Sequence, residues 1–186
     1  MNFIEQEIKG VWVIEPKIYG DKRGYFCEVY KQAEFDAHVG HHVEFVQDNE
    51  SFSTRGVLRG LHFQRGEFSQ AKLVRVSQGV VLDVVVDLRH GSPTRGHHIA
   101  VELRADTGCQ LFIPRGFAHG FVVLSDVAQF QYKVDNPYAP HSEATLRFDD
   151  PALGIDWRIA PADMLLSEKD LKGLSLEEMT PEYLGF

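Results

Sequence analysis

The sequence has few cysteines and no long apolar run. Its two cysteines, Cys27 and Cys109, are too few for the disulfide framework of small secreted domains, so we expect a reducing compartment. The first ten residues, MNFIEQEIKG, are charged and lack the apolar stretch of a signal peptide. No segment approaches the roughly 20 apolar residues that span a bilayer. We therefore expect a cytoplasmic protein that does not enter a membrane.

Positive charge is also scarce. The 186 residues include 19 Lys and Arg against 27 Asp and Glu, which gives a formal net charge of −8. Such a surplus of negative charge disfavours binding to nucleic acid or to an anionic membrane surface. It leaves room for an anionic small molecule, because a few arginines inside one pocket can outweigh the global balance.

Helical periodicity is rare, and short β-branched or aromatic runs are separated by Gly, Asp and Asn. Helical patterns are confined to Lys31–Val39 and to the tail from about Asp163. The expected strands are Val11–Pro16, Tyr25–Tyr30, Val43–Ser53, Leu58–Phe63, Ala71–Val76, Val80–Leu88, His97–Leu103, Gln110–Ile113, Gly120–Leu124 and Ala128–Val134. Regular short strands without βαβ alternation predict an all-β sandwich or barrel such as a jelly roll, with a few short peripheral helices.

The length and composition indicate one compact unit. Apolar residues make up 44% of the chain, and no linker, repeat or low-complexity segment interrupts it. We expect a single jelly-roll domain over residues 1–186, with a C-terminal extension from about residue 160 that packs on the barrel.

Two stretches resemble the paired motifs of the cupin superfamily of small jelly-roll barrels. The second motif, Gly108–His119, fits without a gap, and the first contains His62 at the expected position. Gln64, however, occupies the place of the next histidine ligand, and Glu67 comes too early. A divalent transition metal needs three or four His or carboxylate ligands. The sequence therefore predicts a retained barrel without a metal, unless Glu67 replaces the missing ligand.

Longer motifs surround His62. VLRGLHFQ (57–64), FVQDNESFS (45–53) and QAKLVRV (70–76) resemble the dTDP-4-dehydrorhamnose 3,5-epimerase family. Further segments continue the resemblance: GDKRGYFCEVY (20–30), IPRGFAHGFVVLSD (113–126), FQYKVDNPYAPHSE (130–143) and LSEKD (166–170). It covers about Gly10 to about Gly173. It implies a cupin-like, cytoplasmic isomerase of dTDP-L-rhamnose biosynthesis that converts dTDP-4-dehydro-6-deoxy-D-glucose to dTDP-4-dehydro-L-rhamnose by inverting carbons 3 and 5.

The resemblance also implies a role for each matching residue. His62 is the general base, Asp170 is its orienting partner, Tyr132 is the general acid, and Lys72 stabilises charge on the ketone oxygen. The implied substrate-binding residues are Arg23, Glu28, Gln47, Asp48, Asn49, Arg59, His119, Tyr138, Glu143 and Lys169. The family pattern further implies a homodimer in which Arg23 comes from the neighbouring subunit, and a reaction that needs no cofactor and no metal.

The residue types suit this chemistry. A 4-keto group acidifies the hydrogens on carbons 3 and 5, because the carbanion delocalises onto the ketone oxygen as an enolate. Epimerisation then needs a base on one face, a group that stabilises the enolate oxygen, and an acid on the other face. Histidine is largely neutral near pH 7, whereas tyrosine and lysine are protonated. No GxGxxG motif follows a strand, so no nicotinamide or flavin cofactor is expected.

Several alternatives remain open. Asp83 interrupts an apolar run and competes with Asp170 as the partner of His62 or Lys72. An epimerase that inverts only carbon 3 or only carbon 5 would share the same base. The rival classes are a metal-dependent cupin oxygenase or isomerase, which Gln64 disfavours, and an inert sugar-nucleotide-binding barrel, in which base, acid and lysine have no evident use. The aromatic residues that can stack on thymine are Tyr138, Phe26 and Phe117.

Overall fold

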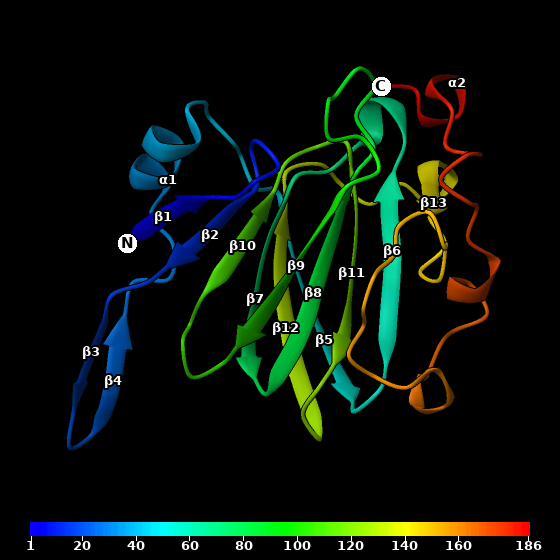
Figure 1. Cartoon of the computed structure of the whole chain (residues 1–186). Coiled ribbons are helices and arrows are strands. Elements are labelled where there is room, and N and C mark those ends of the chain that lie inside the picture. Colours follow the sequence, from blue (N-terminus) through cyan, green and yellow to red (C-terminus); the bar gives the residue numbers. More distant parts are fainter.

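The computed structural model describes all residues from Met1 to Phe186, and strands dominate it (Figure 1). The larger of two main sheets has six strands in the order β1-β2-β10-β7-β12-β5, and each neighbouring pair is antiparallel. Its strands are β1 (Asn2–Glu5), β2 (Trp12–Glu15), β5 (Gln47–Thr54), β7 (Lys72–Gln78), β10 (Gln110–Ile113) and β12 (Val127–Val134).

The smaller sheet has five antiparallel strands in the order β13-β6-β11-β8-β9. They are β6 (Leu58–Gln64), β8 (Val80–Asp87), β9 (His98–Arg104), β11 (Phe117–Val123) and β13 (Glu143–Thr145). The chain alternates between the two sheets from β5 to β8 and again from β10 to β13. The all-β jelly roll with a few short peripheral helices, predicted from the sequence, is confirmed.

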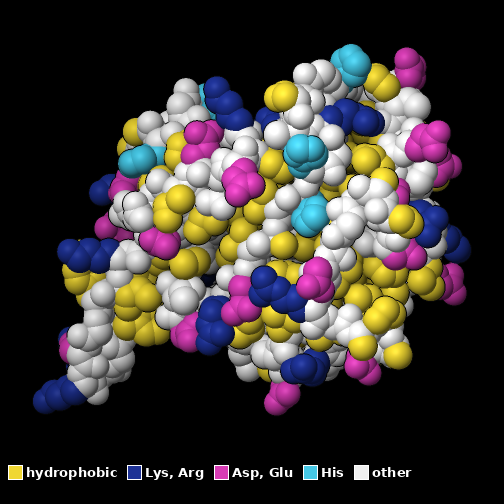
Figure 2. All heavy atoms as spheres, in the orientation of Figure 1, with side chains coloured by type: hydrophobic (Ala, Val, Ile, Leu, Met, Phe, Trp, Pro, Cys, Tyr) yellow, Lys and Arg dark blue, Asp and Glu magenta, His cyan; other side chains and the backbone are white.

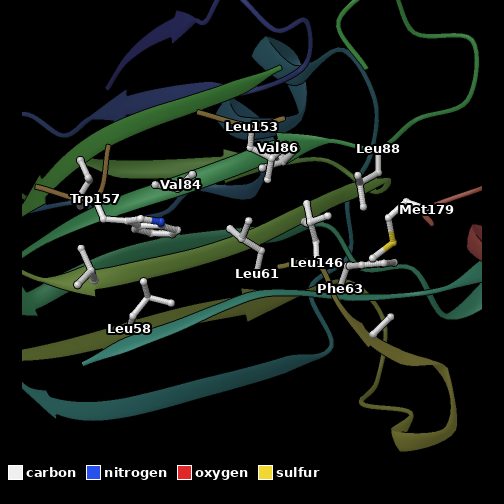
Figure 3. Packing of buried hydrophobic residues seen from close by; sticks show 14 of the residues in the cluster. Leu58, Leu61, Phe63, Val84, Val86, Leu88, Leu146, Leu153, Trp157 and Met179 are labelled. Carbon is white, nitrogen blue, oxygen red and sulfur yellow. The ribbon is translucent and has the colours of Figure 1, made fainter. Parts of the chain in front are cut away.

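Strand β8 shows how the apolar residues divide between two cores. Val85 belongs to the cluster between the two sheets, whereas Val84 and Val86 belong to a second cluster on the other face of the smaller sheet. The C-terminal tail covers that second cluster with Trp157 and Met179 (Figure 3). Because successive side chains of a strand point to opposite faces, burial on both faces requires the nearly continuous apolar run of β8.

The helices lie outside the sheets. Helix α1 (Gln32–Val39) buries Phe35 against Phe112 on the outer face of the larger sheet, with ring centroids 5.0 Å apart. The short helices are η1 (Gly66–Phe68), η2 (Pro140–Ser142), η3 (Pro161–Asp163), η4 (Asp170–Lys172) and α2 (Pro181–Leu184). None of the helices combines the length and the apolar composition needed to cross a membrane.

A hairpin of two short strands, β3 (Ile18–Asp21) and β4 (Gly24–Cys27), projects from the body of the molecule at the lower left of Figure 1. Its aromatic side chains are exposed: Tyr19 by 54%, Tyr25 by 70% and Phe26 by 65%. Figure 2 shows apolar side chains on the part of the hairpin nearest the body and basic groups at its tip.

The strands predicted from the sequence are all present, although several ends differ. The run Val43–Ser53 becomes a strand only at Gln47, because Val43 packs in the cluster beside α1 instead. Strand β11 begins at Phe117, ahead of the predicted start at Gly120. The prediction treated this glycine as the start of the strand, whereas it lies in the strand interior. Strands β1, β3 and β13 were not predicted, since segments of three or four residues are too short to show alternation.

Candidate active site

An open cavity of about 350 Å³ lies between the inner faces of the two sheets, and the C-terminal segment forms one of its walls. Strands β5, β6, β7, β11, β12 and β13 contribute to it. The predicted site residues that line this cavity are Arg59, His62, Lys72, His119, Tyr132, Tyr138, Glu143, Lys169 and Asp170. The predicted base, acid, lysine and orienting carboxylate thus lie together, although the chain brings them from four separate segments.

His62 and Asp170 form a close pair in this cavity. His62 Nε2 lies 2.7 Å from Asp170 Oδ1, the histidine side chain is 27% exposed, and the carboxylate is 3% exposed. Burial by itself raises the pKa of Asp170, but the contact with His62 and hydrogen bonds from Ser167 and the Gly60 N–H outweigh it and lower the pKa to about 2. The carboxylate is therefore ionised near neutral pH, and Nδ1 is the imidazole nitrogen left for a substrate.

A short local motif holds Asp170 in place at the start of η4. The Ser167 hydroxyl donates to Asp170 Oδ2 at 2.6 Å, the Ser167 N–H donates to the same oxygen at 3.0 Å, and the Asp170 N–H donates back to Ser167 Oγ at 3.3 Å. This reciprocal pattern resembles a capping box, in which Ser-x-x-Asp is the local sequence signal. The orientation of the Asp170 carboxylate is therefore fixed in part by its own segment of the tail.

Lys72 lies deep in the cavity on β7. Its ammonium donates to the carbonyl oxygen of His62 at 3.3 Å. Burial lowers the pKa of Lys72 to about 8, against the carboxylates of Asp83 and Glu143, which raise it. The amine therefore stays mostly protonated near pH 7, and its positive charge lies beside the base.

Tyr132, on β12, also reaches the cavity. Burial and the negative charge of Glu143 raise the pKa of Tyr132 above its usual value near 10, and Arg59 opposes the shift. The phenol is therefore protonated at neutral pH and can donate a proton.

His119 lines the same cavity and pairs with Asp83, which is fully buried behind it. His119 Nε2 lies 2.9 Å from Asp83 Oδ2 and 3.0 Å from Oδ1, and the side chains are 7% and 0% exposed. Burial lowers the pKa of His119, although Asp83 opposes the shift, so this imidazole is neutral near pH 7. The alternative that Asp83 is the partner of His62 is wrong, because Asp83 lies on β8 opposite β11 rather than beside the tail.

Three polar side chains bridge the rim of the cavity. Glu143 accepts a hydrogen bond from the Tyr138 hydroxyl at 2.9 Å and forms an ion pair with Lys169. Burial raises the pKa of Glu143, but these two partners outweigh it and keep the pKa below its usual value. The rim therefore connects β13 to the tail segment that also carries Asp170.

Comparison with known proteins identifies the family of the chain. The chain matches the family dTDP-4-dehydrorhamnose 3,5-epimerase over residues 5–178. A dTDP-4-dehydrorhamnose 3,5-epimerase of Escherichia coli is 49% identical over 179 residues, which are 96% of both sequences.

The chain belongs to the dTDP-4-dehydrorhamnose 3,5-epimerase family. It is an epimerase, an enzyme of the isomerase class. The solved structures give the same result. A Legionella pneumophila dTDP-6-deoxy-D-glucose-3,5-epimerase in complex with dTDP-4-keto-L-rhamnose has a TM-score of 0.94 at 45% identity, covering 98% of this chain and 96% of that one. A 3'-monoepimerase from Streptomyces bikiniensis in complex with dTDP-quinovose has a TM-score of 0.87 at 37% identity, covering 97% and 90%.

Some predicted site residues of this epimerase lie outside the cavity. Gln47 and Asn49 share one face of β5, as predicted; the Gln47 amide donates to Asn49 Oδ1 at 2.8 Å and accepts from the Tyr138 N–H at 3.2 Å. Asp48 points the other way and pairs with Lys133 at 2.6 Å on the outer face of the sheet. The alternation of a strand therefore separates Asp48 from its two neighbours.

Arg23 and Glu28 lie farther away. Arg23 is at the turn of the β3–β4 hairpin, its side chain is 83% exposed, and its ion-pair partner is Asp21. Glu28 follows β4 and is exposed. Neither residue lines the cavity of its own chain.

The three aromatic candidates for thymine stacking differ in exposure. Tyr138 and Phe26 are exposed by 54% and 65%, whereas Phe117 is 3% exposed and lies beneath the guanidinium of Arg89, 4.5 Å from its centre. Phe117 is therefore a core residue, and its candidacy is wrong. Its place in a motif gave no indication of its burial.

Gln64, at the position of the missing metal ligand, has protein partners for its whole side chain. Its amide nitrogen donates to the carbonyl oxygens of Phe68 at 2.7 Å and Pro137 at 3.2 Å, and its oxygen accepts from the Ala139 N–H at 2.7 Å. Gln64 thus connects β6 by hydrogen bonds to the backbone segments around Phe68 and Pro137 at the rim of the cavity.

Proposed function

We propose that this epimerase converts dTDP-4-dehydro-6-deoxy-D-glucose to dTDP-4-dehydro-L-rhamnose by proton abstraction and return at carbons 3 and 5, without a metal or a cofactor. The observation that carries the proposal is the 2.7 Å pairing of His62 with an ionised Asp170 in a cavity that also holds Lys72 and Tyr132. The relatives that are 3,5-epimerases favour inversion at both carbons.

His62 acts as the base for both carbons. Nδ1 takes the proton from carbon 3 or carbon 5, and the electron pair of the broken C–H bond moves onto the ketone oxygen. Asp170, at Nε2, fixes the tautomer and stabilises the imidazolium that forms. A partly exposed histidine with a buried carboxylate behind it suits this exchange of a proton with substrate.

Lys72 stabilises the enolate oxygen. Its ammonium is buried, where electrostatic interactions are stronger than in water, and it is mostly charged near pH 7. A donor aimed at a developing oxyanion is worth about 3 kcal/mol in comparable enzymes. The low pKa of Lys72 is thus compatible with its role and sets an upper pH limit to it.

Tyr132 returns a proton to the opposite face of the sugar ring. It comes from β12 of the larger sheet, whereas His62 comes from β6 of the smaller sheet, so the two side chains enter the cavity from opposite walls. The phenol is protonated, because burial and Glu143 raise its pKa. After each inversion the tyrosinate regains a proton from solvent and the His62 imidazolium releases its proton to solvent, which balances the cycle.

The nucleotide end of the substrate binds at the rim. Arg59 can give two parallel hydrogen bonds to phosphate oxygens, and its Nε already donates to Ser53 Oγ at 3.1 Å, which fixes the side chain. Gln47 and Asn49 supply amides along β5, and Tyr138, which is exposed, supplies a ring for the base. His119, Glu143 and Lys169 complete the polar lining around the sugar.

We further propose that the chain acts as a single jelly-roll domain in a cytoplasmic homodimer, in which Arg23 and Glu28 reach the cavity of the neighbouring subunit. The β3–β4 hairpin supports this assembly. It exposes the neighbouring aromatic side chains of Tyr25 and Phe26, and grouped exposed apolar side chains often mark a protein–protein contact. Sedimentation of the wild type and of Arg23→Ala, with assay of mixed Arg23→Ala and His62→Ala subunits, tests the shared site: restored activity in the mixture supports it, and no restoration contradicts it.

The function is tested by incubating the enzyme with dTDP-4-dehydro-6-deoxy-D-glucose in deuterated water. We expect deuterium and inversion at both carbon 3 and carbon 5. Deuterium at one carbon alone would indicate a monoepimerase, the reaction named for the Streptomyces bikiniensis relative. No deuterium at either carbon would contradict the proposal and favour the inert binding barrel. Loss of activity on chelation, with restoration by one divalent metal, would favour a cupin metalloenzyme.

A further inference from the structure

Strand β6 places two functional residues in the cavity at a spacing that a regular strand does not allow. Arg59 and His62 are three positions apart, so an ideal strand would direct them to opposite faces. Both line the cavity nevertheless. Leu58 and Leu61 are also three positions apart, and both are buried in the core cluster on the other face.

The pairing of β6 with β11 explains this spacing. His62 is opposite His119, and Arg59 is opposite Phe121, so three steps along β6 match two steps along β11. Strand β6 therefore contains one extra residue, and Gly60 and Leu61 together face Gly120. Such a β-bulge reverses the alternation of the side chains beyond it, which turns Arg59 to the face of His62.

At the bulge the backbones of β6 and β11 approach each other closely, which we call the crossing of Gly60 and Gly120. Two glycines make this close approach possible. Gly60 has a φ of +139°, and a Cβ on it would lie 2.5 Å from Gly120 Cα. A Cβ on Gly120 would lie 2.6 Å from the carbonyl oxygen of Arg59 and 2.9 Å from Gly60 Cα. Any side chain at either position must push the two strands apart, because the atoms it meets belong to the backbone. Gly120 has no positive φ, so contact alone excludes its side chain.

The bulge also holds the carboxylate behind the base. The N–H of Gly60 donates to Asp170 Oδ1 at 3.2 Å, and His62 Nε2 lies 2.7 Å from the same oxygen. The bulged backbone at Gly60 thus contacts Asp170 directly, and it lies between Arg59 and His62 in the strand. Displacement of this backbone would move all three groups together.

We propose that Gly60 and Gly120 are positioning residues of the epimerase: their close crossing creates the bulge that directs both the proton-abstracting His62 and the phosphate-binding Arg59 into one cavity and receives Asp170. The assignment of roles to His62 and Arg59 rests on the proposed function. The crossing itself rests on the strand register and the backbone distances alone.

The first test is Gly120→Ala. Its methyl group should widen the crossing and weaken both functions at once: kcat for exchange at carbons 3 and 5 should fall about 10²-fold, and the affinity for dTDP should fall about tenfold. Val84→Ala, a cavity-forming change in the cluster on the other face, is the control for lost stability. The proposal is supported if Val84→Ala lowers Tm as much as Gly120→Ala does but keeps kcat and dTDP affinity. It is overturned if Gly120→Ala keeps both within twofold, or if the two variants lose activity in equal proportion to Tm.

A second test does not depend on Gly120→Ala, whose added methyl group could prevent folding. Arg59→Cys, in a chain with Cys27 and Cys109 replaced by serine, introduces one thiol on an exposed position of β6. If the bulge directs position 59 into the cavity, dTDP should slow the reaction of this thiol with an alkylating reagent at least about tenfold. Arg55→Cys, outside the cavity, should react equally with and without the nucleotide.

Equal reactivity of Arg59→Cys with and without dTDP, while the nucleotide still binds, would overturn the proposal even if Gly120→Ala fails to fold. Failure of the proposed function is distinguishable from this result. A wild-type enzyme that takes up no deuterium contradicts the epimerisation, whereas protection of position 59 by dTDP concerns only the direction of the side chain.

Discussion

Two histidines line the cavity, each paired with a carboxylate, and the two pairs differ in burial and in the way the chain assembles them. His62 is 27% exposed, and its partner Asp170 comes from the C-terminal tail. His119 and Asp83 are 7% and 0% exposed, and they come from the adjacent strands β11 and β8. The two histidines are opposite each other in the register of β6 and β11, so the pairs are neighbours in one cavity.

The comparison shows that the surroundings of a histidine–aspartate pair decide what it can do. Burial lowers the pKa of His119, so its imidazole stays neutral near pH 7, donates from Nε2 to Asp83 and keeps Nδ1 as an acceptor. Such a group binds a hydroxyl but resists taking a proton. His62 is more exposed, and the Asp170 carboxylate beside it is held by hydrogen bonds from Ser167 and Gly60. In the proposed reaction this carboxylate stabilises the imidazolium that His62 forms.

The largest effect is expected at His62. His62→Ala should lower exchange at carbons 3 and 5 by about 10²–10⁴-fold while dTDP affinity stays within about twofold, because a positioned base contributes that much. His119→Asn should instead raise KM for the sugar nucleotide and retain measurable exchange. Deuterium uptake by NMR and titration calorimetry with dTDP make the two measurements. If His119→Asn loses exchange as completely as His62→Ala with affinity intact, the distinction between the pairs is wrong.

Lys72 lies between the two pairs, with His62 O at 3.3 Å and the charge of Asp83 nearby. Lys72→Met should lower kcat by about 10²–10³-fold, because the enolate oxygen loses its cation. The pKa of about 8 adds a pH dependence: the ammonium is lost as pH rises through 8, so wild-type kcat should fall above that pH. Lys9→Met, at an exposed lysine, is the matched control. A kcat that stays constant from pH 7 to about 10 would contradict this role.

In the proposed reaction His62 removes a proton and Tyr132 returns one, so a Tyr132 variant can separate the two steps. Tyr132→Phe keeps the ring and deletes the hydroxyl, so inversion should fall about 10²-fold while deuterium uptake by the His62 route falls much less. The ratio of inverted product to incorporated deuterium measures this separation. Should the variant invert as efficiently as it exchanges, another group or a water is the acid. Should both disappear together, the hydroxyl acts before protonation, beside Lys72.

The smallest expected effect concerns acid stability. The pKa of Asp170 is lowered from 3.8 to about 2 in the folded protein, so its contribution to stability is complete above pH 4 and is lost as pH falls through 2. A shift of this size corresponds to about 2 kcal/mol. Urea unfolding at pH 5 and pH 2.5 should show a smaller loss of stability for Asp170→Asn than for the wild type. Asp126→Asn, at an exposed carboxylate, should behave like the wild type, and an unchanged pH dependence in Asp170→Asn would contradict the linkage.

Much of the cavity was predictable because its residues lie in contiguous motifs. The motif around His62 and the segment LSEKD predicted the base and its partner, and the structure pairs His62 with Asp170. The local Ser-x-x-Asp pattern corresponds to the hydrogen bond from Ser167 that holds Asp170. The partner of His119 was not predictable. Asp83 is 36 positions away, and the sequence analysis considered it only as a rival partner for His62 or Lys72. The register of β8 against β11 places Asp83 beside His119.

The sequence by itself determined the class of fold and the chemical groups of the site. The alternation of apolar residues specifies strands, the doubly buried β8 requires its apolar run, and the motifs carry the proposed base, the proposed acid and a lysine. The tertiary structure alone decided which way these groups point. Arg59 and His62 share a face only because Gly60 and Gly120 cross closely and insert one residue into the register, and Asp48 leaves the site because its strand turns it outward. The physical reason is that side-chain direction and burial depend on pairing between strands distant in sequence, which no local pattern records.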